Sequence, residues 1–400
     1  MIYFDYAATT PVSSDVLRSM EPYFSEKYGN PSSIYMIGRE AKEKLCEARH
    51  TIQELIGADR PGEIIFTSGA SESNNLAVKG VAFYADRVLN IKPHILVSSI
   101  EHHSMLDAAK YLAKYFGYEV EYIPVDSEGR IDPKTVKKMI KNNTVFVSVM
   151  YGNNETSTIE PIAKIGEVIS EIKKEREGKE SKIPLIFHSD AVQAFQYFDC
   201  DVNHLMVDML SLTAHKFYGP KGVGLLYVRL GTSFLPQQQG GAQERNQRAG
   251  TENTPYIIGM AKAMEQVAEK KEENEKFISK LTDYLIDRIK TEIPEVELVG
   301  PRDVKKRLPH IASFIFKKVE GESILINLDL VDIAASSGSA CTSGSLETSH
   351  VTKALGYSDI DAHGSVRFSL GRANTKKDID ELMIHLPKIV EKLREMSPIK

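Results

Sequence analysis

The stretch "SLTAHKFYGPKG", residues 211–222, places a lysine directly after an apolar run that is typical of a buried strand. Lys216 precedes an aromatic pair and a Gly-Pro turn, so its amine is expected close to the end of that strand. A desolvated amine is a nucleophile that forms a Schiff base with an aldehyde. The alternative, weighted at least equally, is a lysine that reaches solvent as the strand ends. The competing amine, Lys221, has the Pro-Lys-Gly setting of a surface turn.

Short apolar runs alternate with longer helical patterns around this stretch, from about Glu63 to Val228. Runs that are bounded by turn residues and separated by helices indicate a mostly parallel sheet covered on both faces. Ligands of open α/β sheets bind at the carboxyl ends of the strands, so polar residues after these runs are candidate site residues. The expected strands lie in "EIIFTSGA" (63–70), "PHILVSSIEHHS" (93–104), "TVFVSVMYGNNE" (144–155), "PLIFHSDAVQ" (184–193), "DMLSLTAHK" (208–216) and "GVGLLYVR" (222–229).

The pattern changes after Gly250, where a long charged helix carries an apolar stripe and is followed by the strand "ASFIFK" (312–317). This change predicts a second domain that begins near residue 255. The charged segment "EIKKEREGKESK" (171–182) is interpreted as a solvated helix end or loop.

Composition places the chain among ordinary globular proteins. Its 400 residues are 42% hydrophobic and 26% charged, which suggests two or three domains or one large domain with a smaller partner. The net charge of -5 argues against a nucleic-acid or membrane partner. No apolar run approaches a bilayer span, and the N-terminus lacks the pattern of a signal peptide. Three cysteines without a CxxC pair suggest a reducing compartment, the cytoplasm.

Polar clusters follow four of the expected strands. "FTSGASESNN" (66–75) has the small residues and helix start that hold a phosphate, with a helix N-cap at Ser71 as the more probable alternative. "FHSDAVQ" (187–193) offers Asp190 to a pyridinium nitrogen, or as the cap of the next helix. In "EHHS" (101–104) His102 is a candidate for ring stacking and proton transfer, against a structural histidine. Asn154 in "GNNE" offers a neutral donor, or only a turn.

The remaining unusual segment is "AASSGSACTSGSLE" (334–347), which surrounds Cys341 with small residues. A structural cysteine is usually a small hydrophobe in a core, and this setting is the opposite. Glycine and serine lower the cost of moving the backbone, so this segment is expected to be flexible.

These candidate residues, in their order along the chain, resemble the site motifs of the fold-type I enzymes that use pyridoxal 5'-phosphate (PLP). More narrowly, they resemble those of the cysteine desulfurases of the NifS/IscS type. The resemblance runs nearly end to end. It rests on "YFDYAATTP" (3–11), "YGNPSSIY" (28–35), "TSGASESNN" (67–75), "EHHS", "NNET" (153–156), "DAVQ" (190–193), "AHKFYGPKG" (214–222), "RAGTENT" (248–254), "SSGSACTSG" (336–344) and "VRFSLGR" (366–372).

The resemblance implies a role for each matching residue. Lys216 carries the Schiff base, Asp190 faces the pyridine nitrogen, and His102 stacks on the cofactor and moves protons. Arg367 binds the substrate carboxylate as a bidentate ion pair. Without the resemblance, a surface salt bridge is the alternative interpretation of this arginine. Ala70, Ser71, Thr213 and His215 are the implied phosphate ligands. Gln193 and Asn154 contact the ring hydroxyl, and Asn154 also contacts the substrate. Thr251 reaches the phosphate that is bound in a neighbouring subunit.

The implied reaction removes sulfur from L-cysteine, giving L-alanine and a persulfide on Cys341. The implied partners are a second copy in a homodimer with shared active sites and a sulfur acceptor such as an iron–sulfur scaffold protein. The resemblance implies no resident metal. Cys341 is a candidate for a transient ligand of an iron–sulfur cluster. The alternatives are a selenocysteine lyase or another PLP lyase or aminotransferase on the same fold. A non-catalytic sulfur carrier is the alternative from a different class.

The same resemblance implies a domain division. A large PLP-binding domain, residues 15–255, holds a mostly parallel seven-stranded sheet. A smaller α+β domain combines residues 1–14 with 256–400 and carries a mobile cysteine loop at about 334–347. Cys46 falls in a helical pattern as a packing residue, and Cys200 receives no role.

Overall fold

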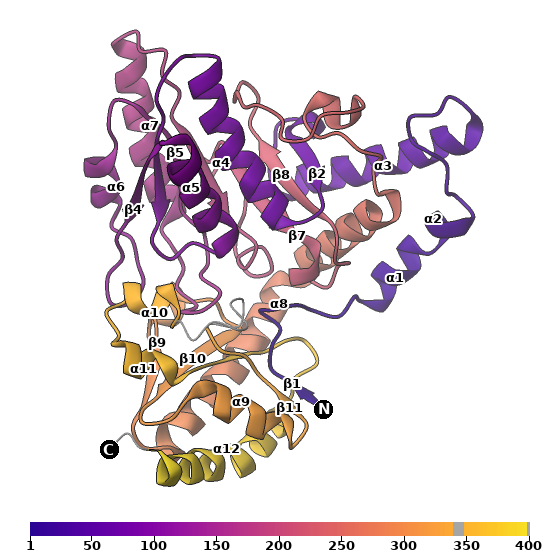
Figure 1. The fold of residues 1–400 in the computed structure, drawn as a ribbon. Coiled ribbons are helices and arrows are strands. Elements are labelled where there is room, and N and C mark those ends of the chain that lie inside the picture. The colour runs from indigo at the N-terminus through magenta and orange to yellow at the C-terminus, as the bar shows by residue number, and fades with distance from the viewer. Residues whose placement is uncertain (339–347, 398–400) are drawn as a thin grey trace.

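A seven-stranded sheet forms the centre of the computed structural model, which describes residues 1–338 and 348–397 (Figure 1). The strand order is β2-β8-β7-β6-β5-β3-β4, and β8 alone runs antiparallel to its neighbours. The predicted mostly parallel sheet is therefore confirmed. Its strands are β2 (Ile64–Thr67), β3 (His94–Ser98), β4 (Glu119–Ile123), β5 (Thr144–Ser148), β6 (Ile186–Asp190), β7 (Met209–Thr213) and β8 (Gly224–Val228).

The sequence patterns missed β4 because its residues, "EVEYI", are mostly exposed at the sheet edge and lack a continuous apolar run. The other six strands are buried along their whole length, which explains their near-continuous hydrophobic character.

Helices cover both faces of this sheet. On one face α4 (Ala70–Arg87) and α5 (His103–Phe116) pack over alternate strand residues such as Ile65 and Val97. The opposite face packs Phe66 and Leu96 against a different set of helices. That set includes α1 (Ser14–Met20), α3 (Met36–Leu55), α6 (Pro133–Met139) and α7 (Ile162–Gly178), while α2 (Pro22–Ser25) links α1 to α3.

A second hydrophobic core surrounds a three-stranded antiparallel sheet of order β12-β10-β9. A two-stranded parallel sheet, in which Ile2 pairs with Ile333, brings the start of the chain to this core. The strands are β1 (Ile2–Tyr3), β9 (Val296–Val299), β10 (Ile311–Phe316), β11 (Ile333–Ala334) and β12 (Ser365–Ser369), with helices α9 (Gly321–Asp329), α10 (His350–Ala354), α11 (Asp359–His363) and α12 (Lys376–Met396).

The long helix α8 (Thr254–Glu292) contributes to both cores. Its first half buries Ile257 and Met264 beside the large sheet, and its second half buries Leu285 and Ile289 beside the small one. Between them Lys270 departs from helical geometry. The division at residues 14/15 and 255/256 stays a prediction, and a single helix connects the two cores. None of the helices in residues 1–338 and 348–397 has the length and apolar character needed to cross a membrane.

Short 3-10 helices complete the described secondary structure: η1 (Pro61–Glu63), η2 (Ala214–Lys216), η3 (Gln243–Asn246) and η4 (Val304–Lys306). In η3, three consecutive residues adopt left-handed backbone angles, including Glu244 at φ 45°. A buried ion pair holds this segment, because Arg49 donates from both terminal nitrogens to Glu244 at 2.8 and 2.7 Å. Arg49 also donates to the Ile64 carbonyl at the start of β2, so the pair fixes η3 to the large sheet.

Replacing Arg49 with Met is expected to destabilise the protein by about 3–5 kcal/mol, because the carboxylate of Glu244 is left buried without a counterion. Chemical denaturation measures this loss. Adding Glu244→Gln to Arg49→Met removes the uncompensated charge and should restore much of the stability. A loss below about 1 kcal/mol in the single variant would contradict a structural role for the pair.

Candidate active site

A cavity of about 760 Å³ opens at the carboxyl ends of the central strands. This is the position that open α/β sheets use for ligands, and the volume suits a small cofactor together with a substrate. The cavity brings together ten of the residues predicted from the sequence: Ala70, Ser71, His102, Asn154, Asp190, Gln193, Thr213, His215, Lys216 and Arg367.

Lys216 enters the cavity from η2, directly after β7. Its ammonium donates hydrogen bonds to the carbonyl oxygens of Ala7 and Ala8 at 2.7 and 2.8 Å. The carbonyl of Ala7 also accepts from Gln193 Nε2 at 2.9 Å, so the N-terminal segment fixes two predicted cofactor residues at once. Lys221, expected on a surface turn, is exposed and lines the same cavity.

A chain of hydrogen bonds links Asp190 to His102. Asn74 donates from Nδ2 to Asp190 Oδ2 at 2.8 Å and to Ser104 Oγ at 2.9 Å. Ser104 Oγ in turn lies 2.9 Å from His102 Nδ1. Asp190 Oδ1 accepts from the Val192 amide at 3.0 Å, so this carboxylate both faces the cavity and caps a turn.

This chain determines the tautomer of His102. The backbone N–H of Ser104 donates to His102 Nδ1 at 3.1 Å, so in the neutral imidazole Nδ1 is the acceptor and Nε2 holds the proton. Burial lowers the pKa of His102, although the nearby charge of Asp190 acts in the opposite direction. The ring is therefore neutral near pH 7 and holds its proton at Nε2.

The N-terminus of α4 forms one end of the cavity. Its N-cap is Gly69, whose φ of 157° is in a region that favours glycine, so the prediction of Ser71 as the capping residue is wrong. Gly69 offers no side-chain acceptor to the first amides of the helix, which leaves them available to an anion. Thr213 Oγ1 donates to the Val223 carbonyl at 3.1 Å, and His215 Nδ1 lies 3.1 Å from Thr9 Oγ1.

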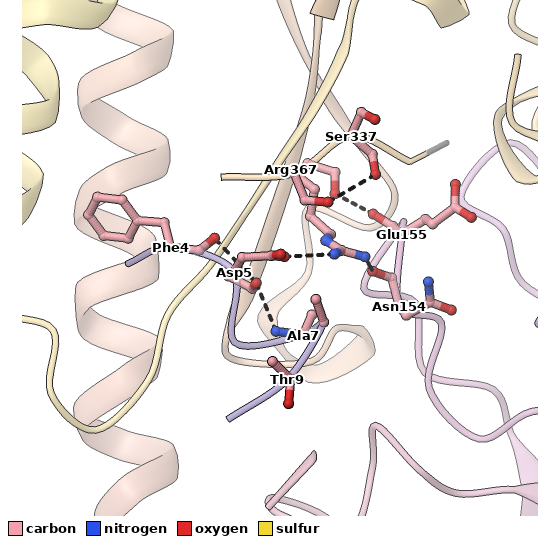
Figure 2. A network of polar contacts seen from close by, with 12 residues as sticks. Phe4, Asp5, Ala7, Thr9, Asn154, Glu155, Ser337 and Arg367 are labelled. Carbon is pink, nitrogen blue, oxygen red and sulfur yellow. Dashed lines mark hydrogen bonds and ion pairs between the residues drawn. The ribbon is translucent and has the colours of Figure 1, made fainter. Parts of the chain in front are cut away.

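Arg367, a residue of β12, also lines the cavity (Figure 2). Its guanidinium donates to Asp5 Oδ1 and to the Asn154 carbonyl, both at 2.9 Å. The side chain is only 6% exposed, and Nε has no hydrogen-bond partner among the described residues. Burial raises the pKa of Asp5, and the positive charge of Arg367 counteracts that effect.

Glu155 lies next to this ion pair and contacts both sides of the segment that carries Cys341. Ser349 donates to Glu155 Oε2 at 2.5 Å, and a Cβ on Gly338 would lie 2.6 Å from the same oxygen. Burial raises the pKa of Glu155 to about 7, although Ser349 and Arg367 lower it. Ser336 exchanges two backbone hydrogen bonds with Arg367, so these flanking residues begin beside the predicted carboxylate clamp.

Two predicted residues remain. Cys341 falls within residues 339–347, so the prediction for its thiol lies outside the described part of the chain. Thr251 lines a separate, smaller hollow with Ser68 and Arg248, and its expected contact with a neighbouring subunit stays a prediction. Of the other cysteines, Cys200 is buried and Cys46 is exposed, so the expected packing role of Cys46 receives no support from this chain alone.

The predictions missed several residues that build the site, chiefly Asp5, Asn74 and Ser104. All three lie inside motifs on which the sequence resemblance rests, "YFDYAATTP", "TSGASESNN" and "EHHS". Their partners are 116 positions away for Asn74 and 362 for Asp5, and no local pattern indicates such contacts.

The residues of the cavity fit PLP. Lys216 supplies an amine, Asp190 a carboxylate that is 5% exposed, and the N-terminus of α4 a set of amides for a phosphate. The buried Oδ1 of Asn74, without a partner among the described residues, adds an unused acceptor next to Asp190. Together with the sheet topology, this donor set defines a fold-type I PLP-dependent enzyme.

Comparison with known proteins gives the family. The model of the class-V aminotransferases matches residues 2–382, and the chain belongs to this family. The cysteine desulfurase IscS of Dictyoglomus turgidum is 47% identical over the whole chain and 97% of its own length. Among solved structures, a NifS-like protein is 35% identical with a TM-score of 0.86, covering 98% of this chain and 99% of its own. SspA, solved in complex with cysteine, is also 35% identical, with a TM-score of 0.79 over 92% of this chain and 99% of its own.

Ser104→Ala should raise the pKa of His102, because it removes a hydrogen bond to Nδ1 that opposes protonation of the ring. The acidic limb of the pH profile of turnover is expected to move upward by about half a unit, with the rate at pH 7 lowered by less than about twofold because the ring stays mostly neutral there. Ser104→Thr keeps the hydroxyl and is the matched control. An unchanged profile in Ser104→Ala would show that Ser104 does not act through His102.

Glu155→Gln should change how stability depends on pH. In the wild type the folded-state pKa of about 7 exceeds the ordinary value of 4.5, so folding favours the protonated form and stability falls as pH rises between these values. Glutamine cannot ionise, so the variant should be more stable relative to wild type at pH 8 than at pH 5, by on the order of 1–3 kcal/mol. Thermal unfolding at both pH values measures the difference. Equal differences at both would contradict the assignment.

Proposed function

We propose that this protein is a PLP-dependent cysteine desulfurase, a sulfurtransferase that converts L-cysteine to L-alanine and retains the sulfur as a persulfide on Cys341. The observation that carries the proposal is the position of Arg367. The cavity that holds Lys216 and Asp190 also holds this guanidinium, and the same arginine pairs by its backbone with Ser336, five residues before Cys341. This arrangement supports a single site that combines the amine, the carboxylate clamp and the thiol.

Arg367 binds the carboxylate of the amino-acid substrate. Asp5 and the Asn154 carbonyl each take one proton of its terminal nitrogens, which holds the guanidinium plane in place. Each terminal nitrogen carries a second proton, so two donors remain for a carboxylate. Asp5 thus orients the clamp.

Lys216, Asp190 and His102 serve the cofactor, with Gln193 and Asn154 beside it. Bound PLP supplies an electron sink that stabilises negative charge next to the substrate carboxylate. Asp190 would keep the pyridine nitrogen protonated, and Ala70, Ser71, Thr213 and His215, which line the same cavity, would hold the phosphate. His102 holds a proton at Nε2, where it can be donated, because Ser104 occupies Nδ1.

Cys341 takes the sulfur. Its thiolate attacks the substrate sulfur, the bond between substrate Cβ and sulfur breaks, and an S–S bond forms on the protein. The carbon skeleton takes up a proton and leaves as L-alanine. A soft, ionisable thiol supports this attack, and a hydroxyl does not.

The working unit is a homodimer with Thr251 completing the phosphate site of the other subunit. Thr251 lies outside its own chain's cavity, which supports this assignment. The segment from α2 to the start of α3 exposes Phe24, Tyr28, Ile34 and Met36 to between 55 and 88%, and it projects from the body of the chain in Figure 1. Such a cluster of exposed apolar residues is typical of a protein interface. The persulfide then passes to an acceptor such as an iron–sulfur scaffold protein, in the cytoplasm.

The competing functions are a selenocysteine lyase or aminotransferase on the same fold, and a non-catalytic sulfur carrier. Transamination needs no protein thiol, which makes Cys341 the discriminating residue. A sulfur carrier needs neither Lys216 nor Arg367, so the presence of both residues in one cavity argues against that function.

Cys341→Ala is expected to keep the visible absorbance of the bound cofactor and to lose sulfide and alanine production from L-cysteine by at least about 100-fold, because the nucleophile is absent. Lys216→Ala is the companion control and should lose the cofactor link that borohydride fixes in the wild type. Undiminished desulfuration in Cys341→Ala would overturn the proposal, and a colourless wild type without the link would favour the carrier.

A further inference from the structure

Three neighbouring strands of the large sheet have their amino ends side by side, at the end of the sheet opposite the cavity. Thr144, His94 and Glu119 are the first residues of β5, β3 and β4, and His94 pairs in register with both of the others. Paired residues of neighbouring strands point to the same face, and so does Glu121, two residues after Glu119. The sheet register therefore places one imidazole and two carboxylates in a single group.

The ligand-type atoms of this group converge. The closest nitrogen and oxygen atoms of His94, Glu119 and Glu121 all lie within 4.8 Å of one another. Lys141 already places a cation there, since its ammonium bonds to Glu119 Oε1 at 2.6 Å and also to Glu121. Two carboxylates that converge on one positive charge form an arrangement that can also bind a metal cation.

His94 points an unused nitrogen into this group. The side chain is fully buried, and its Nε2 has no hydrogen-bond partner among the described residues, with Glu121 Oε1 at 3.8 Å. His94 Nδ1 lies 2.7 Å from Thr144 Oγ1. When Nδ1–H donates to Thr144, Nε2 presents its lone pair to the carboxylates, the arrangement that metal-binding histidines adopt. Burial also lowers the pKa of His94, which keeps the ring neutral.

We propose that His94, Glu119 and Glu121 form a binding site for a divalent transition-metal ion that exchanges with the ammonium of Lys141. One imidazole and two carboxylates suit Mn²⁺, Co²⁺ or Zn²⁺ better than Ca²⁺ or Mg²⁺, which prefer oxygen alone. Lys141 is 40% exposed and its ion pairs are on the surface, so the side chain moves to solvent at small cost. The metal gives Nε2 the partner it lacks.

The site stands apart from the desulfurase chemistry. It is built on the amino ends of the strands, whereas the cavity lies at their carboxyl ends, so its loading should alter stability and leave turnover unchanged. Removing any of its residues should likewise leave L-cysteine turnover unchanged, which separates a failure of this proposal from a failure of the proposed function.

Titration of the full-length holoenzyme with Mn²⁺, followed by the loss of the free-ion electron paramagnetic resonance signal, tests the proposal. Mn²⁺ is chosen because thiolates such as Cys46 and Cys341 bind it weakly. One ion per chain is expected. Lys141→Met should bind it about two- to twentyfold more tightly, because the competing ammonium is gone.

Two kinds of control accompany the titration. Lys137→Met removes a neighbouring lysine that pairs with Glu171 on the surface, and should leave the affinity unchanged. Glu119→Gln and Glu121→Gln should weaken binding at least tenfold and abolish the rise in melting temperature that Mn²⁺ produces. Both glutamates are at least partly exposed, so these variants remain folded even if substitution of the buried His94 does not.

Absence of saturable binding in Lys141→Met at millimolar Mn²⁺ would overturn the proposal. So would binding that Glu119→Gln and Glu121→Gln leave unchanged, because the ion would then be held elsewhere. Tighter binding in Lys141→Met together with loss in both glutamine variants supports it.

Discussion

The buried ion pair between Arg367 and Asp5 is the interaction on which the site depends. It joins β12 of the small sheet to the N-terminal segment, and the Asn154 carbonyl adds the loop that follows β5 of the large sheet. The N-terminal segment then continues to Ala7 and Ala8, whose carbonyls hold Lys216 and Gln193. Three parts of the chain therefore meet around one guanidinium. Burial makes the pair costly to break, so the position of the Arg367 guanidinium and that of the Lys216 amine are fixed together.

Burial also sets the charge states of the site. It lowers the pKa of His102 and brings that of His215 to about 4, so two imidazoles beside a lysine stay neutral. The neighbouring Glu155 has its pKa raised to about 7 by the same desolvation. Neutral rings and a carboxyl near its titration point leave the net charge of the cavity to its other charged lining residues, Lys216, Lys221, Arg367, Asp5, Glu72 and Asp190. That balance of three cations and three anions suits a zwitterionic amino acid.

The sheet separates two kinds of chemistry. Its carboxyl ends carry the cavity, because loops leave the strands there and helix N-termini point inward. Its amino ends carry the group of His94, Glu119 and Glu121, which the register of three strands brings together. Neither group depends on the other, so one fold can hold a sulfur-transfer site and a proposed metal site without interference.

The sequence by itself determined the class of fold, the family and the identity of ten of the residues that line the cavity. It could do so because fully buried strands appear as continuous apolar runs and because the site residues follow those runs within short motifs. It did not determine β4, an edge strand without such a run, or the capping of α4, which a glycine takes in place of Ser71. Only the tertiary structure decided that Asp5 holds Arg367 and that Asn74 and Ser104 connect Asp190 to His102. These contacts join residues up to 362 positions apart, and they depend on strand register and helix packing rather than on any local pattern.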